Sequence, residues 1–146
     1  MKLKLICIAL FLLFVSVISG CATLGPVYQK ADKIPPDVGV IYTYRTFNIV
    51  GSAVTTKLYT NKGQTYLARI QTGGYFPFYA KPGEVDLSAA TEAESSITLD
   101  VKAGQVYFVK LHIGMGFIVG RPYLTIVDND LGEKEIADCK LIPKAE

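Results

Sequence analysis

The sequence predicts an all-β protein, an antiparallel β-sandwich of about seven to nine strands that ends in a short C-terminal helix. Apolar and polar residues alternate along several short segments, which is the period of a strand buried on one face. Turn-forming residues separate these segments at the spacing found in sandwiches. Once the first 20 residues are set aside, 126 of the 146 residues remain. That length suits one domain with a real core, but not two.

The N-terminus has the composition of a signal peptide. Two lysines precede an apolar run of about 14 residues, at 5–18. This run is shorter than the roughly 20 apolar residues that a membrane-spanning helix needs. Ser19 and Gly20 are small enough for a peptidase to approach the backbone. We therefore expect cleavage between Gly20 and Cys21, with residues 1–20 removed.

The four residues Ile18-Ser19-Gly20-Cys21 resemble the bacterial lipobox, in which the cysteine receives diacylglycerol and becomes the acylated N-terminus. The resemblance implies two or three acyl chains on Cys21, and two or more chains anchor a protein stably. Ala22 is compatible with sorting to the outer membrane, where the protein would face the periplasm. An uncleaved anchor or a plain secretory signal is the alternative.

Charge and cysteine content limit the partners. Without Lys2 and Lys4, 13 of the 15 basic residues remain against 13 acidic ones. A neutral domain argues against nucleic acid and against a basic membrane-binding patch. The expected partners are the membrane, through the lipid, and an envelope protein, with no metal and no cofactor beyond the lipid. Cys139 would be the one remaining thiol, expected to be buried, with a reactive or intermolecular thiol as the alternative.

The first part of the mature chain is expected to be a lipidated tether over 21–37, because it holds three prolines and no period. The β-sandwich domain would follow over 38–146. Its first strand, from Val38 to Arg45, carries apolar residues on both faces and is expected to be covered on both sides. A hairpin is expected over 54–70, with the sequence NKG at its turn and its glycine in a left-handed position.

The remaining strands are expected over 75–80, 85–89, 97–101, 105–113 and 123–128. Pro82 and Gly83 stand where a type II turn requires them. Residues 133–141 are expected to be a short helix, with a strand as the alternative. Ile136 and Cys139 would share one helix face, and two glutamates would lie near the helix start.

Several stretches together resemble a known family: CATLGP, VGVIYTYR, KPGEVDLSA and LDVKAGQVYFVKLHIGMGFIVGRPYLTIVD. They are similar to the small prokaryotic lipoproteins of the DUF2846 family, a domain of unknown function, over about residues 21–141. The central turns also resemble those of PEGA-type repeats, which are short sandwiches. Both resemblances imply an all-β fold, and neither implies an activity.

No residue set demands a particular chemistry, and we expect no catalytic residue and no metal ligand. His112 is the one histidine, and strand alternation places it on the wetter face. A hydrolase built on His112 is the alternative, although no serine lies in a G-x-S-x-G elbow. The pairs Glu84 with Asp86 and Glu92 with Glu94 lie in or beside turns, where we expect them to be solvated.

The segment IGMGFIVGRP at 113–122 breaks the strand pattern, because three glycines interrupt it. The favoured interpretation is internal packing, in which the glycines make room for aromatic rings such as Tyr75 or Phe78. The alternative is an apolar hairpin that docks on a partner or enters the bilayer. The residues of this candidate docking hairpin are Gly114, Met115, Gly116, Phe117, Ile118, Val119 and Gly120.

The sequence therefore predicts an outer-membrane lipoprotein that faces the periplasm and acts as a non-catalytic binding or structural module. The alternatives are an assembly lipoprotein of a secretion or envelope complex, and the hydrolase that would use His112.

Overall fold

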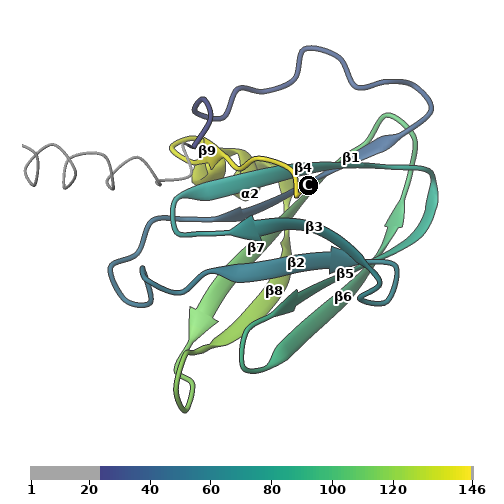
Figure 1. The fold of residues 1–146 in the computed structure, drawn as a ribbon. Helices are drawn as coiled ribbons and strands as arrows, with labels where there is room; N and C mark the ends of the chain where they lie inside the picture. The colour runs from purple at the N-terminus through teal and green to yellow at the C-terminus, as the bar shows by residue number, and fades with distance from the viewer. Residues whose placement is uncertain (1–23, 146) are drawn as a thin grey trace, which may run out of the picture.

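The computed structural model describes residues 24–145, so the expected cleavage and lipidation site at Gly20 and Cys21 lies outside the described range. Within that range the chain forms nine strands and one helix (Figure 1). The elements are β1 (Gly39–Arg45), β2 (Thr56–Thr60), β3 (Thr65–Ile70), β4 (Gly74–Ala80), β5 (Gly83–Ala90), β6 (Glu94–Val101), β7 (Val106–Gly114), β8 (Arg121–Val127), α2 (Asn129–Ile136) and β9 (Lys140–Leu141). The predicted all-β class is confirmed.

The strands form two sheets that pack face to face. The larger sheet has the order β8-β7-β1-β4-β9, and the smaller sheet has the order β3-β2-β5-β6. Their facing side chains, among them Ile41, Leu58 and Val109, make the main core. Alternation along each strand supplies this core from one face, because successive side chains of a strand point to opposite sides.

A second core lies on the outer face of the larger sheet. Tyr42, Tyr44 and Phe108 pack there with Ile136 of α2, and Tyr28 covers the same face. The molecule therefore has three layers: the smaller sheet, the larger sheet, and a cover made by α2 and the segment that precedes β1. Every residue of β1 is buried, which confirms that this strand is covered on both sides.

The pairing is mostly antiparallel, with two exceptions in the larger sheet. β1 pairs in parallel with β7, where Val40 is opposite Val106, and β4 pairs in parallel with β9. The sequence did not predict these two pairs, because a strand period shows which face is buried and not which strand is the neighbour.

The helix differs from the expected range of 133–141. It begins at Asn129, because the Asp128 side chain caps it by accepting a hydrogen bond from the backbone nitrogen of Leu131 at 2.9 Å. The helix ends at Ile136, and Lys140–Leu141 is strand β9. The two glutamates of the segment consequently lie in the second half of the helix and not near its start.

Part of the expected tether belongs to the folded domain. The backbone nitrogen of Gly25 donates to the Leu141 oxygen at 2.7 Å, and that of Tyr28 donates to the Cys139 oxygen at 2.8 Å. These bonds pair residues 25–28 with the chain around β9. The prolines of the segment did not reveal this contact, because the pairing partner lies more than 100 positions away in the sequence.

The predicted hairpin turn is present, whereas the chain only bends at Pro82 and enters β5 at Gly83, where a type II turn was expected. β2 and β3 form the expected antiparallel hairpin, and Gly63 has φ +78° in its turn. Gly83 has φ +129°, a backbone conformation that residues other than glycine rarely adopt.

Candidate functional site

Two long loops leave the larger sheet at the same end of the molecule. Because β1 and β7 run in parallel, their last residues, Arg45 and Gly114, lie at one end of the sheet. The β1–β2 loop covers residues 46–55, and the β7–β8 loop covers residues 115–120. Both loops line one groove of about 240 Å³, to which Val50 and Ile118 contribute.

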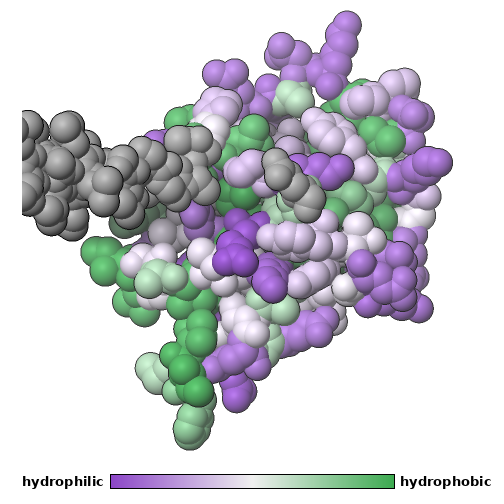
Figure 2. Space-filling view, in the orientation of Figure 1, coloured by the Kyte–Doolittle hydropathy of each residue, from purple (hydrophilic) through white to green (hydrophobic). Residues whose placement is uncertain are grey.

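The two loops expose large apolar side chains, and neither loop contains a charged residue. The β7–β8 loop is the more exposed, with Met115 at 97 %, Phe117 at 96 % and Ile118 at 89 %. Figure 2 shows hydrophobic side chains gathered at the lower left over both loops. We call these side chains the apolar end: Phe47, Ile49, Val50, Met115, Phe117, Ile118 and Val119.

The exposure of this loop corrects the favoured interpretation of the glycine-interrupted segment. Residues 115–119 are not packed in the interior, because β7 ends at Gly114 and β8 begins at Arg121. Gly120 is buried and packs closely, since a Cβ there would lie 2.7 Å from Ile113. Gly114 faces an aromatic ring as expected, since a Cβ there would lie 2.6 Å from the ring of Tyr123. The ring above this glycine is thus Tyr123, and not Tyr75 or Phe78.

A single carboxylate holds the β7–β8 loop. Glu92, in the turn between β5 and β6, accepts hydrogen bonds from the backbone nitrogens of Phe117, Ile118 and Val119 at 2.7, 2.9 and 3.0 Å. These backbone donors, that of Val119 foremost, lower the pKa of Glu92. The Thr91 hydroxyl also donates to the Gly120 oxygen at 2.6 Å. The loop is therefore fixed in shape although its side chains are exposed.

The sequence did not reveal this role of Glu92, which we expected to be a solvated turn residue. Its partners lie 25 to 27 positions away, and they are backbone groups without a sequence signature. The glycine at position 116 is a modest sequence signal of this contact. A Cβ at this position would overlap both the Glu92 carboxylate and the backbone of Gly120.

Arg45 fixes the other loop. Its guanidinium donates to the Val54 oxygen at 2.6 Å and to the Gly51 oxygen at 2.7 Å, which ties both halves of the β1–β2 loop to the end of β1. The side chain is buried, and burial lowers the pKa of Arg45. A planar guanidinium suits this role, because its donors point in fixed directions toward two acceptors.

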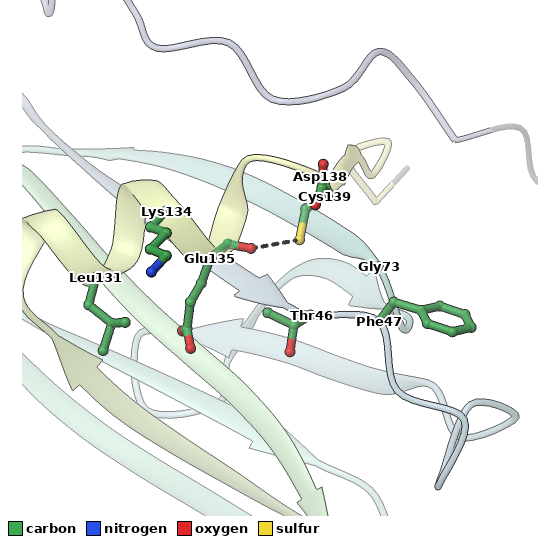
Figure 3. A pocket seen from close by; sticks show the side chains of 8 residues that line it. All are labelled: Thr46, Phe47, Gly73, Leu131, Lys134, Glu135, Asp138 and Cys139. Atoms are coloured by element: carbon green, nitrogen blue, oxygen red, sulfur yellow. Dashed lines mark hydrogen bonds between the residues drawn. The ribbon is translucent and has the colours of Figure 1, made fainter.

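A separate cleft of about 450 Å³ lies between α2 and the beginning of the β1–β2 loop. Figure 3 shows side chains of α2 on one side of it and Thr46 with Phe47 on the other, the Phe47 ring extending away from the helix. Glu135 accepts hydrogen bonds from the Tyr44 hydroxyl and from Lys110 Nζ, both at 2.6 Å. Burial would raise the pKa of Glu135, but these two donors outweigh burial and lower it.

Cys139 lies at the back of this cleft and is buried, as expected from the sequence. Its Sγ atom is 3.7 Å from the Arg45 oxygen and 3.9 Å from the Glu135 oxygen. Burial, together with the negative charges of Asp138 and Glu135, raises the pKa of Cys139 to about 11. The thiol is therefore protonated near neutral pH, whereas a nucleophilic cysteine reacts as the thiolate.

His112 is exposed on β7, and its ring stacks on Tyr123 with centroids 5.1 Å apart. It does not line the cleft that contains Cys139. Asp86, one of the expected solvated carboxylates, accepts a hydrogen bond from the backbone nitrogen of Lys62 at 2.6 Å and supports the hairpin turn. In residues 24–145 we find no group of three or more His, Cys, Asp or Glu residues that could hold a metal ion.

The fold and the two loops together define a β-sandwich domain with an ordered apolar end. The family model described as "Protein of unknown function (DUF2846)" matches residues 36–121, more than half of the chain, and the protein belongs to this family. The match includes both loops of the apolar end and Glu92, but not α2. No curated protein and no solved structure matches the chain significantly. Over the described residues, the one helix is neither long nor apolar enough to cross a membrane.

Proposed function

We propose that the protein is a lipid-anchored outer-membrane lipoprotein that faces the periplasm and acts as a non-catalytic binding or structural module. One observation carries the binding role: the apolar end presents exposed side chains on loops whose backbones are held by Glu92 and Arg45. A preorganised loop loses little conformational entropy when a target covers it. The lipid anchor follows from the sequence around Cys21, whose resemblance to a lipobox is given above.

The reactive groups of the domain support a structural role for the polar clusters. Glu135 is engaged by Tyr44 and Lys110, and the Cys139 thiol is held in its protonated form. A catalytic acid, base or nucleophile needs a free lone pair or a proton that can move at the working pH. Glu135 and Cys139 make contacts that attach the helix and the chain after it to the larger sheet, through Tyr44, Lys110 and the Arg45 oxygen.

Labelling with a fatty acid tests the anchor. We expect the wild type to take up label and to lose residues 1–20, and we expect Cys21→Ser to take up none. Cys139→Ser is the matched control, because it removes the other thiol of the mature chain and should leave labelling unchanged. Equal labelling of wild type and Cys21→Ser would contradict the proposal. Separation of inner and outer membranes on a density gradient then tests the location.

The rival within binding proteins is an assembly lipoprotein of a secretion or envelope complex. The same apolar end favours it, because exposed apolar patches also mark protein interfaces. Cross-linking in intact cells followed by mass spectrometry separates the two: a large envelope complex would support the assembly role. The likeness of the central turns to PEGA-type repeats remains a prediction, and it adds no ligand.

The rival from another class is the hydrolase that would use His112. Because this side chain is exposed, His112→Ala should fold normally. If the protein is a binding module, cells that depend on it should grow normally with the His112→Ala variant. A growth defect together with normal amounts of folded variant would instead favour catalysis.

A further inference from the structure

The described chain begins at the end of the molecule that carries the apolar loops. β4 starts at Gly74, which is opposite Arg45 at the end of β1, and β9 pairs with this start of β4. Gly25 is in turn hydrogen-bonded to Leu141 of β9. Figure 1 shows this entry point, the β1–β2 loop and the β7–β8 loop along the left side of the domain.

The covalent distance to the expected anchor is short. Leu24, the first described residue, follows Cys21 by three positions. Three residues span at most about 10 Å, since an extended chain advances about 3.3–3.6 Å per residue. An acylated Cys21 would therefore hold this end of the domain against the membrane, and not at the far side of a long spacer.

We propose that the apolar end docks on the bilayer that holds the acyl chains of Cys21, so that the domain sits on the membrane with both loops in the interface. This orientation rests on the proposed lipid anchor. The loops make the apolar contact with the bilayer, and the acyl chains on Cys21 keep the protein bound to it.

The chemistry of the loops fits a lipid surface. Charged side chains are costly in hydrocarbon, and residues 46–55 and 115–120 contain none. Backbone N–H groups also need partners there, and Glu92 already satisfies those of Phe117, Ile118 and Val119. The charged carboxylate of Glu92 contacts the backbone of Phe117, so we place this contact at headgroup depth and only the loop side chains deeper.

The base of the β7–β8 hairpin is more polar than its tip. Arg121 directly follows the loop and is exposed, and Tyr123 is 45 % exposed. Tyrosine and arginine are residues that suit the headgroup level of a bilayer, because each joins an apolar body to a polar end. A loop tip that is apolar and a base that carries these two residues match the polarity of the membrane interface.

Tryptophan fluorescence tests the orientation, because the protein contains no tryptophan. Phe117→Trp would be prepared in the mature, acylated protein and reconstituted into vesicles of phosphatidylethanolamine and phosphatidylglycerol with brominated acyl chains. We expect blue-shifted emission and at least twofold quenching relative to vesicles without bromine. Met115→Trp and Ile49→Trp repeat the test at two other exposed positions, in case one variant folds poorly.

The matched control is Tyr79→Trp. Tyr79 is also an exposed aromatic residue, at 51 %, but it is opposite Val40 near the start of β1 and so lies at the far end of the domain. Its emission should be unaffected by brominated lipid. Equal quenching at positions 79 and 117, or quenching at neither, would overturn the proposal.

Four further outcomes identify other occupants or separate this inference from the anchor. A blue shift at position 117 in native membranes without quenching in pure lipid would show a protein partner and overturn docking on lipid. A blue shift that depends on protein concentration without lipid would show self-association and overturn it equally. Acylated Cys21 with unquenched Trp at position 117 would refute the orientation alone. Quenching at position 117 in protein whose Cys21 is found to carry no acyl chain when isolated from its own membranes would refute the anchor alone.

Discussion

The Glu92 carboxylate lies 2.7 Å from the backbone nitrogen of Phe117, and this contact joins the turn after β5 to the exposed tip of the β7–β8 hairpin. The same carboxylate also accepts from the two following backbone nitrogens. The most exposed apolar residues of the domain are therefore presented by a loop whose tip is held by the carboxylate of Glu92, while Thr91 holds its end at Gly120.

Replacing Glu92 with glutamine should loosen this loop and leave the rest of the fold unchanged. The amide keeps the size of the side chain, but it replaces one acceptor oxygen by a donor and removes the charge that strengthens the bonds. We expect the amides of residues 117–119 to exchange with deuterium at least several-fold faster. Glu94→Gln, a change at the neighbouring exposed carboxylate, is the control and should not alter this exchange.

Acidification should release the loop at a pH below the ordinary pKa of a glutamate side chain. The folded-state pKa of Glu92 is lowered from its ordinary 4.5, so its contribution is present above the unfolded-state pKa and is lost as the pH falls through the folded-state value. Amide protection of residues 117–119 should therefore persist at pH 4.5 and disappear only at lower pH. Loss of protection centred at or above pH 4.5 in a domain that remains folded would contradict this expectation.

Replacing Gly132 with leucine should destabilise the attachment of α2. A side chain at this buried helix position would overlap the ring of Phe108 on β7. Overpacking of this kind costs about 1–3 kcal/mol in the free energy of unfolding, which urea denaturation measures. Lys134→Ala is the control in the same helix, because Lys134 is exposed. Equal stability of Gly132→Leu and wild type would show that the helix does not sit as described.

The Cys139 thiol should resist modification in the folded protein. It is 2 % exposed, and its pKa is raised to about 11, so very little thiolate is present at pH 8. We expect a disulfide reagent to react with Cys139 at a rate limited by unfolding, and to react at once in denaturant. Rapid stoichiometric reaction of the native protein would mean that the cleft opens readily.

The sequence predicted the strands well, because their period and turn residues are local signals. Alternation at Ile97, Leu99 and Val101 placed β6, and Gly63 placed the hairpin between β2 and β3. The start of α2 was predicted too late, since the decisive signal was the cap at Asp128 and not the pattern of the helix itself.

The candidate site was predicted only in part. The glycines at 114, 116 and 120 marked the correct segment, but packing and exposure give the same sequence pattern there. The side chains after Gly114 are exposed because β7 ends there. The loop has a defined conformation because Glu92 binds its backbone, and these partners are distant from Glu92 in sequence. Contacts of this kind leave no period and no spacing in a single sequence.

The two parallel strand pairs have a consequence for the order of folding. Val40 is opposite Val106 and Gly74 is opposite Lys140, so in both pairs the partners are 66 positions apart. Non-local pairs of this kind form slowly, because a long loop must close before any contact is gained. If the chain folds from its N-terminus, one edge of β1 therefore stays unpaired until β7 is available. One edge of β4 stays unpaired until β9 is available. During that interval the unpaired backbone N–H and C=O groups along one edge of β1 are open to pairing with other chains, so the partly folded chain is most exposed to aggregation before its second half is available.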